Sequence, residues 1–338
     1  MATSKYCLIM VFDYQGTLSR SGTPRGLLGM SKDIRNAFNA AHLLCGIPKK
    51  NITIITDVAP SGPKSPCPWE VDSSDKDNPN VIRLIYPSIS VVLESMMKFI
   101  NKIWMLENGK KRKVELFSYF SGHGVTLADP YNPKGKKTSC IILINSSGRE
   151  RRYLTKKELI KIYHNKIEPD NLGMVTIPII KRKLLPKTSN TEYIYTPSTI
   201  TVDSGATDIP IVDIEIFFLY DACQAGSLSG LKYKYVVDNV FESTHEDDMK
   251  IPLSMAISVT NDIQEAPSCS DGSPFTAQIY ELIRKAKEEK EVLTVKRLQK
   301  NIKENLHPLL MRRCTPTITI SVPSLTAPAP IISCNSEE

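Results

Sequence analysis

The chain has 338 residues, of which 41% are hydrophobic and 23% are charged, and its formal net charge is +7. This composition is typical of a globular protein and excludes a largely disordered chain. No apolar run reaches the roughly 18 residues of a membrane span, and no aromatic-rich basic motif accompanies the basic excess. We therefore expect no membrane and no nucleic-acid partner.

The first 120 residues alternate between strand and helix patterns. Apolar runs predict three strands, at residues 6–13, 51–56 and 114–120. Helical spacing of apolar residues predicts two helices, at 31–46 with Ser31 as cap and at 88–106. Gly- and Pro-rich composition predicts two loops, at 15–29 and 57–80. This order predicts an α/β fold with a mostly parallel sheet covered on both faces.

The second half contains the most apolar strand pattern, residues 211–218, in which five of eight residues are Ile or Phe. We expect that strand to be buried on both faces. Further strands are predicted at 139–145 and 150–154, as a hairpin, and at 251–260 and 315–322. Further helices are predicted at 155–163, 274–290 and 294–305. The remaining segments are predicted as a β-rich insertion or mobile loop (172–208), a loop (227–250) and a flexible tail (324–338).

Two candidate chemical groups follow separate predicted strands. His123 lies between glycines after the strand at 114–120, and Cys223 lies among small residues after the strand at 211–218. Parallel sheets place their chemistry at the carboxyl ends of strands, so the two side chains are expected to meet. A thiol has a pKa of about 8.5, and a neighbouring imidazole can take its proton. The pattern predicts a cysteine nucleophile with a histidine base.

The motifs resemble those of the caspase-like cysteine peptidases, most closely the metacaspases. The resemblance lies in Ser118-Tyr119-Phe120-Ser121-Gly122-His123-Gly124 and Asp221-Ala222-Cys223-Gln224-Ala225-Gly226. Weaker similarities lie around Gly29–Ala37, Ser258–Asp262, Ser273–Thr276 and Thr315–Ile318. The resemblance implies one peptidase domain over residues 1–323, with loop 57–80 and insertion 172–208 inside it. Its fold would be a three-layer α-β-α sandwich around a sheet of about six strands.

The resemblance also implies a mechanism and a substrate class. Cys223 would be the nucleophile, His123 the general base and acid, and the backbone N–H groups of Gly124 and Cys223 the oxyanion hole. The products would form through a thioester acyl-enzyme. Positions matching the metacaspase pocket for a basic residue are Asp33, Ser121 and Asp221, whereas Arg20 resembles a caspase arginine that would hold a substrate aspartate. We favour cleavage after Arg or Lys, because a carboxylate pairs with guanidinium and repels aspartate.

Two departures from the metacaspase pattern affect the expected regulation. Where many metacaspases bind calcium, this chain has Thr155-Lys156-Lys157-Glu158 and Ser227-Leu228-Ser229-Gly230. Lysines cannot replace the oxygen ligands that calcium needs, so we expect no metal, no cofactor and calcium-independent activity. Cys223 follows His123 by 100 positions, about twice the usual caspase separation of roughly 50. The insertion accounts for much of the excess, and Lys181-Arg182-Lys183 within it would suit self-cleavage.

Three functional alternatives remain open at this point. The first is a metacaspase-like peptidase that cuts after Arg or Lys, the second is a caspase-like enzyme that cuts after Asp, and the third is a catalytically weak binding or decoy scaffold. The expected partners are protein or peptide substrates. A monomer is favoured, although the oligomeric state stays open. Eight scattered cysteines without a CxxC pair, and no secretion-signal pattern, favour a reducing, cytoplasmic compartment.

Overall fold

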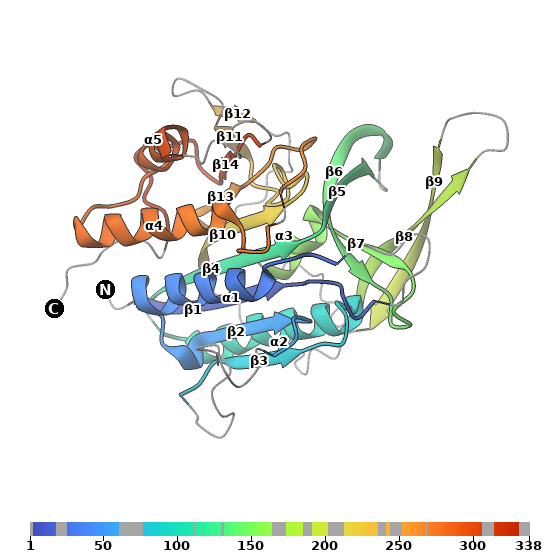
Figure 1. The fold of residues 1–338 in the computed structure, drawn as a ribbon, viewed down its shortest axis with the longest axis horizontal. Helices are drawn as coiled ribbons and strands as arrows, with labels where there is room; N and C mark the ends of the chain where they lie inside the picture. Colours follow the sequence, from blue (N-terminus) through green and yellow to red (C-terminus); the bar gives the residue numbers. More distant parts are fainter. Residues whose placement is uncertain are drawn as a thin grey trace.

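A nine-stranded sheet forms the centre of the computed structural model (Figure 1), with strand order β12-β11-β14-β13-β10-β4-β1-β2-β3. The structure describes residues 3–17, 26–60, 77–110, 112–129, 132–163, 174–184, 191–201, 213–235, 241–243, 252–267, 269–305 and 314–330. Within this part of the chain the protein is a mixed α/β fold. No helix in these ranges is long and apolar enough to cross a lipid bilayer.

Six neighbouring strands of this sheet run parallel. They are β3 (Asn80–Arg83), β2 (Ile52–Thr56), β1 (Thr3–Val11), β4 (Lys113–Gly122), β10 (Ile214–Ala222) and β13 (Ser254–Ser258). Three antiparallel strands extend one edge: β14 (Thr317–Ile320), β11 (Tyr233–Tyr235) and β12 (Phe241–Ser243). The α/β class with a mostly parallel sheet is therefore confirmed, whereas the predicted number of about six strands is too low.

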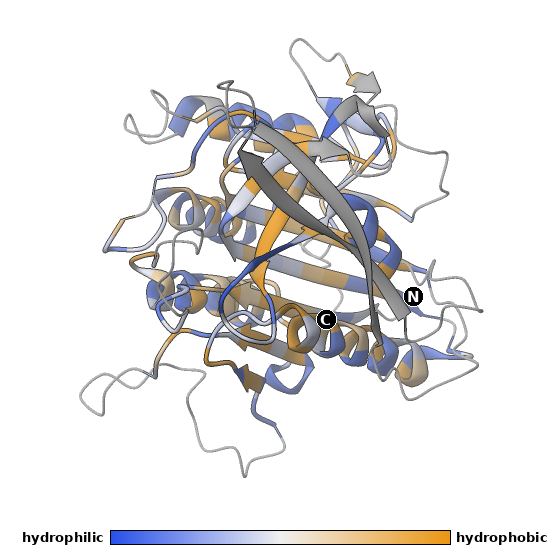
Figure 2. Cartoon of the chain, turned by 90° about the vertical axis from the view of Figure 1, so that its right-hand side faces the viewer, coloured by the Kyte–Doolittle hydropathy of each residue, from blue (hydrophilic) through white to orange (hydrophobic). Residues whose placement is uncertain are grey.

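Helices cover both faces of the sheet, and the sheet separates two apolar cores. One core joins Phe117 and Phe217 to α1 (Met30–Asn39), α4 (Pro274–Glu288) and α5 (Val295–Asn305). The other joins Leu116 and Phe218 to α2 (Ile89–Glu107) and α3 (Lys156–Tyr163). Neighbouring residues of β4 and β10 thus face opposite cores, as the period of a strand requires. Figure 2 shows hydrophobic stretches interleaved with hydrophilic ones along the helices, the pattern of helices with one buried face.

Two smaller sheets lie beside the main one. β5 (Gly124–Asp129), β6 (Asn132–Ile144) and β7 (Arg151–Thr155) form an antiparallel sheet, and its β6–β7 hairpin was predicted. Next to β7 lies an antiparallel pair, β8 (Met174–Leu184) and β9 (Thr191–Thr201), which is prominent at the right of Figure 1. Strand structure within the insertion 172–208 agrees with the β-rich alternative of its prediction.

Several local predictions were wrong for identifiable reasons. The N-cap of α1 is Gly29, at φ 74°, and not Ser31. This left-handed conformation is outside the range of a right-handed helix, so α1 begins after Gly29, and an alanine methyl there would lie 2.2 Å from the Cys269 carbonyl oxygen. A π-helix, Ala40–Leu44, continues α1.

Three segments predicted as irregular contain ordered structure. The loop 57–80 ends in the first residue of β3, and the loop 227–250 contains β11 and β12. The tail 324–338 is not flexible over its first part, because Ala327 and Ala329 are buried and the Ala329 amide donates to the Leu293 carbonyl (2.7 Å). Residues 331–338 lie outside the described residues, as does Arg20.

Candidate active site

His123 and Cys223 emerge next to each other from the central sheet. β4 ends at Gly122, directly before His123, and β10 ends at Ala222, directly before Cys223. These two strands are parallel neighbours in a register that pairs Gly122 with Ala222. Both turns therefore start at the same height at the carboxyl edge of the sheet.

A cavity of about 610 Å³ opens at this edge. Its walls include every described residue that the sequence indicated for the site: Asp33, Ser121, His123, Gly124, Asp221 and Cys223. Arg20, the alternative pocket residue, lies outside the described residues. The candidate nucleophile, the candidate base and the acidic residues expected to bind a basic substrate side chain thus line the same cavity.

The Cys223 thiol is half-buried and lies against the loop after β13. The main-chain amide of Ala266 donates to its Sγ (3.2 Å). Burial raises the pKa of the Cys223 thiol above its ordinary value, and the negative charges of Glu265 and Asp221 add to this, while the Ala266 hydrogen bond opposes it. Near neutral pH the thiol therefore keeps its proton, and nucleophilic attack requires a base to remove it.

The residue after the nucleophile is held in an unusual conformation. Gln224 has φ 53°, in the left-handed region of backbone conformation that residues other than glycine rarely adopt. Its main-chain amide donates to the Gln264 carbonyl (2.8 Å), and its Oε1 accepts from the Thr126 amide (2.5 Å). Its carbonyl accepts from Ser139 Oγ (2.9 Å). Contacts from β5, β6 and the loop after β13 thus fix the turn that carries Cys223.

Two buried carboxyl groups form the acidic end of the cavity. Asp33, at the start of α1, accepts from the Ser273 amide (2.7 Å) and from Ser121 Oγ (3.3 Å). Asp221 accepts from Thr276 Oγ1 (2.6 Å). Burial, reinforced by the charge of Asp221, raises the pKa of Asp33 to about 8, and burial raises the pKa of Asp221 as well. A cation that entered this end would stabilise the ionised carboxylates and so favour release of the proton that the pair retains.

Sequence reasoning missed lining residues from two other elements. Glu265, Ala266 and Cys269 come from the loop between β13 and α4, where no motif marks them. Arg151 comes from β7, and it is one of several basic residues in that stretch.

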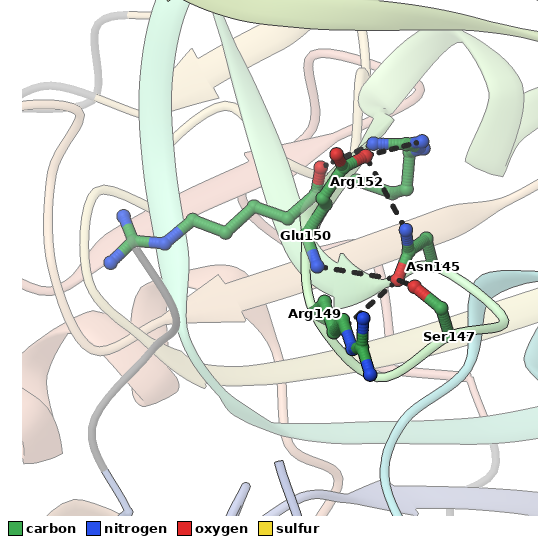
Figure 3. Close-up of polar contacts among 6 residues, drawn as sticks. Asn145, Ser147, Arg149, Glu150 and Arg152 are labelled. Carbon is green, nitrogen blue, oxygen red and sulfur yellow. Dashed lines mark hydrogen bonds and ion pairs between the residues drawn. The ribbon is translucent and has the colours of Figure 1, made fainter. Parts of the chain in front are cut away.

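The turn between β6 and β7 orders the strand that carries Arg151. Figure 3 shows Asn145 Oδ1 accepting from the amides of Arg149 (3.0 Å) and Glu150 (3.2 Å). Arg152 pairs with Glu150 (3.1 Å) near the surface. Because successive side chains of a strand alternate between faces, Arg151 can line the cavity while Arg152 pairs outside it.

Comparisons with known proteins leave the function open. No protein-family model matches the chain, and no curated protein matches it either. Among solved structures, the chain is similar to protein GSU0716 from Geobacter sulfurreducens, with 11% sequence identity over 97% of this chain and 98% of that chain. The TM-score of that match is 0.49.

The contact between the two turns leads to a first testable prediction, for Gly124→Ala. A methyl group at Gly124 would lie 2.1 Å from the carbonyl oxygen of Cys223, so the two turns would have to separate. We expect this variant to lose about 1–3 kcal/mol of unfolding free energy, measured by urea denaturation. The control is Gly26→Ala, whose methyl group meets the flexible Gln15 side chain at 3.1 Å. Equal stabilities of the two variants would contradict the prediction.

Proposed function

We propose that the protein is a cysteine endopeptidase of the metacaspase type that cleaves peptides after arginine or lysine. The observation that carries this proposal is the shared cavity, in which the Cys223 thiol, the His123 turn and the Asp33–Asp221 carboxyl pair line one space. A nucleophile alone would fit many enzymes. A nucleophile beside a buried acidic pocket fits hydrolysis directed by a cationic side chain.

The proposed reaction proceeds in two stages. His123 takes the thiol proton while Cys223 Sγ forms a bond to the scissile carbonyl carbon, and the backbone N–H groups of Gly124 and Cys223 stabilise the resulting oxyanion. The C–N bond then breaks, and His123 gives its proton to the leaving amine. In the second stage His123 takes a proton from water while the resulting hydroxide bonds to the thioester carbon. The C–S bond then breaks, the carboxylic acid product leaves, and His123 returns its proton to Cys223 Sγ.

Substrate choice in this proposal follows from the charges of the pocket. A guanidinium or ammonium group that enters beside Asp33 and Asp221 replaces a carboxyl proton as the neutralising charge. A substrate aspartate would instead add a third acid to two buried ones, which is unfavourable in a low-dielectric site.

The proposal includes independence from calcium and from other cofactors. Among the described residues, no group of three or more His, Cys, Asp or Glu side chains could hold a metal ion, and α3 begins with Lys156 and Lys157. We further propose a reducing, cytoplasmic setting, which suits the six described cysteines, because none of them forms a disulfide.

The experiment that tests this function compares two fluorogenic peptides, one ending in Arg and one in Asp, in the presence of a calcium chelator. We expect the purified protein to cleave the Arg peptide at least about 100-fold faster, and the Cys223→Ala variant to cleave neither. Faster cleavage of the Asp peptide would replace the proposal by the caspase-like alternative. Activity that appears only after calcium is added would refute calcium independence. No cleavage of either peptide, with or without calcium, would favour the scaffold.

A further inference from the structure

Tyr14 packs against the His123 turn and contacts His123 in two ways, through its hydroxyl and through its ring. Its hydroxyl accepts a hydrogen bond from the main-chain amide of His123 (3.1 Å) and donates one to the carbonyl of Ile142 (2.8 Å). The rings of Tyr14 and His123 lie 4.7 Å apart, tilted by 48°. Ile142 itself donates to the His123 carbonyl (2.9 Å), so β6 holds the His123 carbonyl directly and the His123 amide through the phenol.

The main chain of Tyr14 is itself fixed on both sides. Its amide donates to Asp57 Oδ2 (2.9 Å), and the other oxygen of the same carboxyl group accepts from the Asp13 amide (2.7 Å). Its carbonyl accepts from the amide of Thr17 (3.2 Å) and from the Thr17 hydroxyl (2.7 Å). These bonds hold Tyr14 at φ 61°, a left-handed conformation that a tyrosine rarely adopts. Such a conformation persists only where the surroundings over-determine it, and it is frequent near functional sites.

Tyr14 is only 1% exposed, so it does not contact a substrate directly. Burial raises the pKa of its hydroxyl far above the ordinary value, so the phenol stays protonated and can act as donor and acceptor at the same time. A buried phenol with both hydrogen bonds satisfied holds its partners in one geometry.

We propose that Tyr14 is the positioning residue for His123: its ring and hydroxyl hold the imidazole in the orientation from which it takes the Cys223 proton. This role rests on the proposed cysteine-peptidase function. It assigns catalytic importance to the segment that follows β1, a strand that supplies no reacting group. A small change in the orientation of a base is costly, because proton transfer requires the donor and acceptor to lie within hydrogen-bond reach.

The test is the rate at which iodoacetamide alkylates Cys223 between about pH 5 and pH 9, measured by mass spectrometry of the peptide that contains Cys223. This readout does not require peptide hydrolysis. In the unmodified protein we expect the rate to rise with an inflection between about pH 5 and pH 8, where histidine side chains titrate. Tyr14→Phe keeps the ring and removes the hydroxyl, and we expect it to weaken this inflection and to lower the rate at pH 7 about tenfold. His123→Ala should remove the inflection.

A matched control separates positioning from stability. Tyr6 lies in β1, the strand that precedes Tyr14, is also buried, and donates its hydroxyl hydrogen bond to Glu107 Oε1 (2.5 Å). Tyr6→Phe therefore also removes a buried hydroxyl, but we expect it to keep the alkylation profile of the unmodified protein. With the Arg peptide, Tyr14→Phe should lower kcat about tenfold and leave KM unchanged, because Tyr14 does not contact substrate.

The possible failures are distinguishable. A normal profile in Tyr14→Phe together with a slow one in His123→Ala would overturn the role of Tyr14 and leave the dyad intact. Equal losses in Tyr14→Phe and Tyr6→Phe would also overturn it, since both would then reflect general destabilisation. An unchanged alkylation profile in His123→Ala would contradict the proposed Cys223–His123 dyad, and the role of Tyr14 would be refuted with it.

Discussion

Replacement of His123 by alanine is expected to lower kcat for an Arg peptide by about 10³-fold, within the range of 10²–10⁴ that general acid–base catalysis contributes. In the proposed mechanism His123 takes the proton of the Cys223 thiol. Burial and the nearby carboxylates raise the pKa of Cys223, so without a base the thiol keeps its proton near neutral pH. KM should change little, because the acidic pocket at Asp33 and Asp221 does not involve the imidazole.

The pH dependence of the remaining activity gives this prediction a second signature. In His123→Ala the thiolate can form only by direct loss of the thiol proton to solvent. Because the pKa of Cys223 is raised, residual activity should keep increasing with pH beyond the ordinary thiol range of about 8.5. The unmodified protein should reach its plateau earlier, since the imidazole accepts the proton there.

The control for His123→Ala is the corresponding substitution of His42. That side chain lies in the π-helix after α1, where its Nδ1 forms a hydrogen bond with the Ile47 carbonyl (2.9 Å), and it does not line the cavity. His42→Ala should keep full activity. In the double variant His123→Ala/Cys223→Ala, activity should be no lower than in Cys223→Ala alone, because the two groups act as one unit. A His123→Ala enzyme with normal kcat would contradict the mechanism.

The parts of the fold that sequence patterns predicted are those with a continuous apolar signal. β4 and β10 are buried on both faces, so long runs of Ile, Leu, Phe and Tyr mark them. His123 and Cys223 directly follow these two strands, so both residues must lie at the carboxyl ends of the strands. For this reason, the edge that carries His123 and Cys223 could be predicted without coordinates.

The missed strands are short and only partly buried. β3 has two exposed and two half-buried residues, and two of the three residues of β11 are half-buried. Such segments owe their pairing to a neighbouring strand, and their own sequence shows no clear alternation. At the start of α1, the left-handed Gly29 lies close to the Cys269 carbonyl, a tertiary contact that the local sequence does not indicate.

The site residues that sequence reasoning missed depend on packing between distant segments. Nothing in the residues around Tyr14 indicates that its hydroxyl meets His123, 109 positions later. The same holds for the Ala266 amide, which reaches Cys223 from a loop 43 positions away. By contrast, Asp33 was proposed from the resemblance, and its contact with the Ser273 amide adds an anchor that no motif predicted.

Replacement of Asp33 by asparagine is expected to reduce kcat/KM for the Arg peptide by about 10²–10³-fold. Loss of one partner from a buried, hydrogen-bonded charge pair costs about 2–5 kcal/mol, and each 1.4 kcal/mol corresponds to a factor of ten. Asparagine preserves the shape and can still accept from the Ser273 amide. The change therefore removes charge while keeping most of the packing. Its matched control is Asp271→Asn, an exposed acid paired with Lys32 next to the same helix, which should behave as the unmodified protein.

The same substitution is expected to stabilise the protein at alkaline pH. The pKa of Asp33 is about 8 in the folded protein and about 3.9 in an unfolded chain. Between these values the folded state binds more protons than the unfolded state, so stability falls as pH rises from about 4 to about 8. Asp33→Asn cannot ionise and escapes this loss. We expect urea denaturation at pH 8 to show a gain on the order of 2–5 kcal/mol, and no gain near pH 4.

Loss of the proton held by the Asp33–Asp221 pair should therefore raise activity and lower stability. Without substrate, the Asp33–Asp221 pair retains a proton that the unfolded chain would lose. A bound arginine supplies a positive charge in its place, so binding should release a proton. It follows that kcat/KM for the Arg peptide should rise with pH up to about 8, whereas the lower kcat/KM of Asp33→Asn should level off at a lower pH. If Asp33→Asn cleaved the Arg peptide normally, or if it lost stability at pH 8, the acid pair could not be the site that recognises a basic side chain.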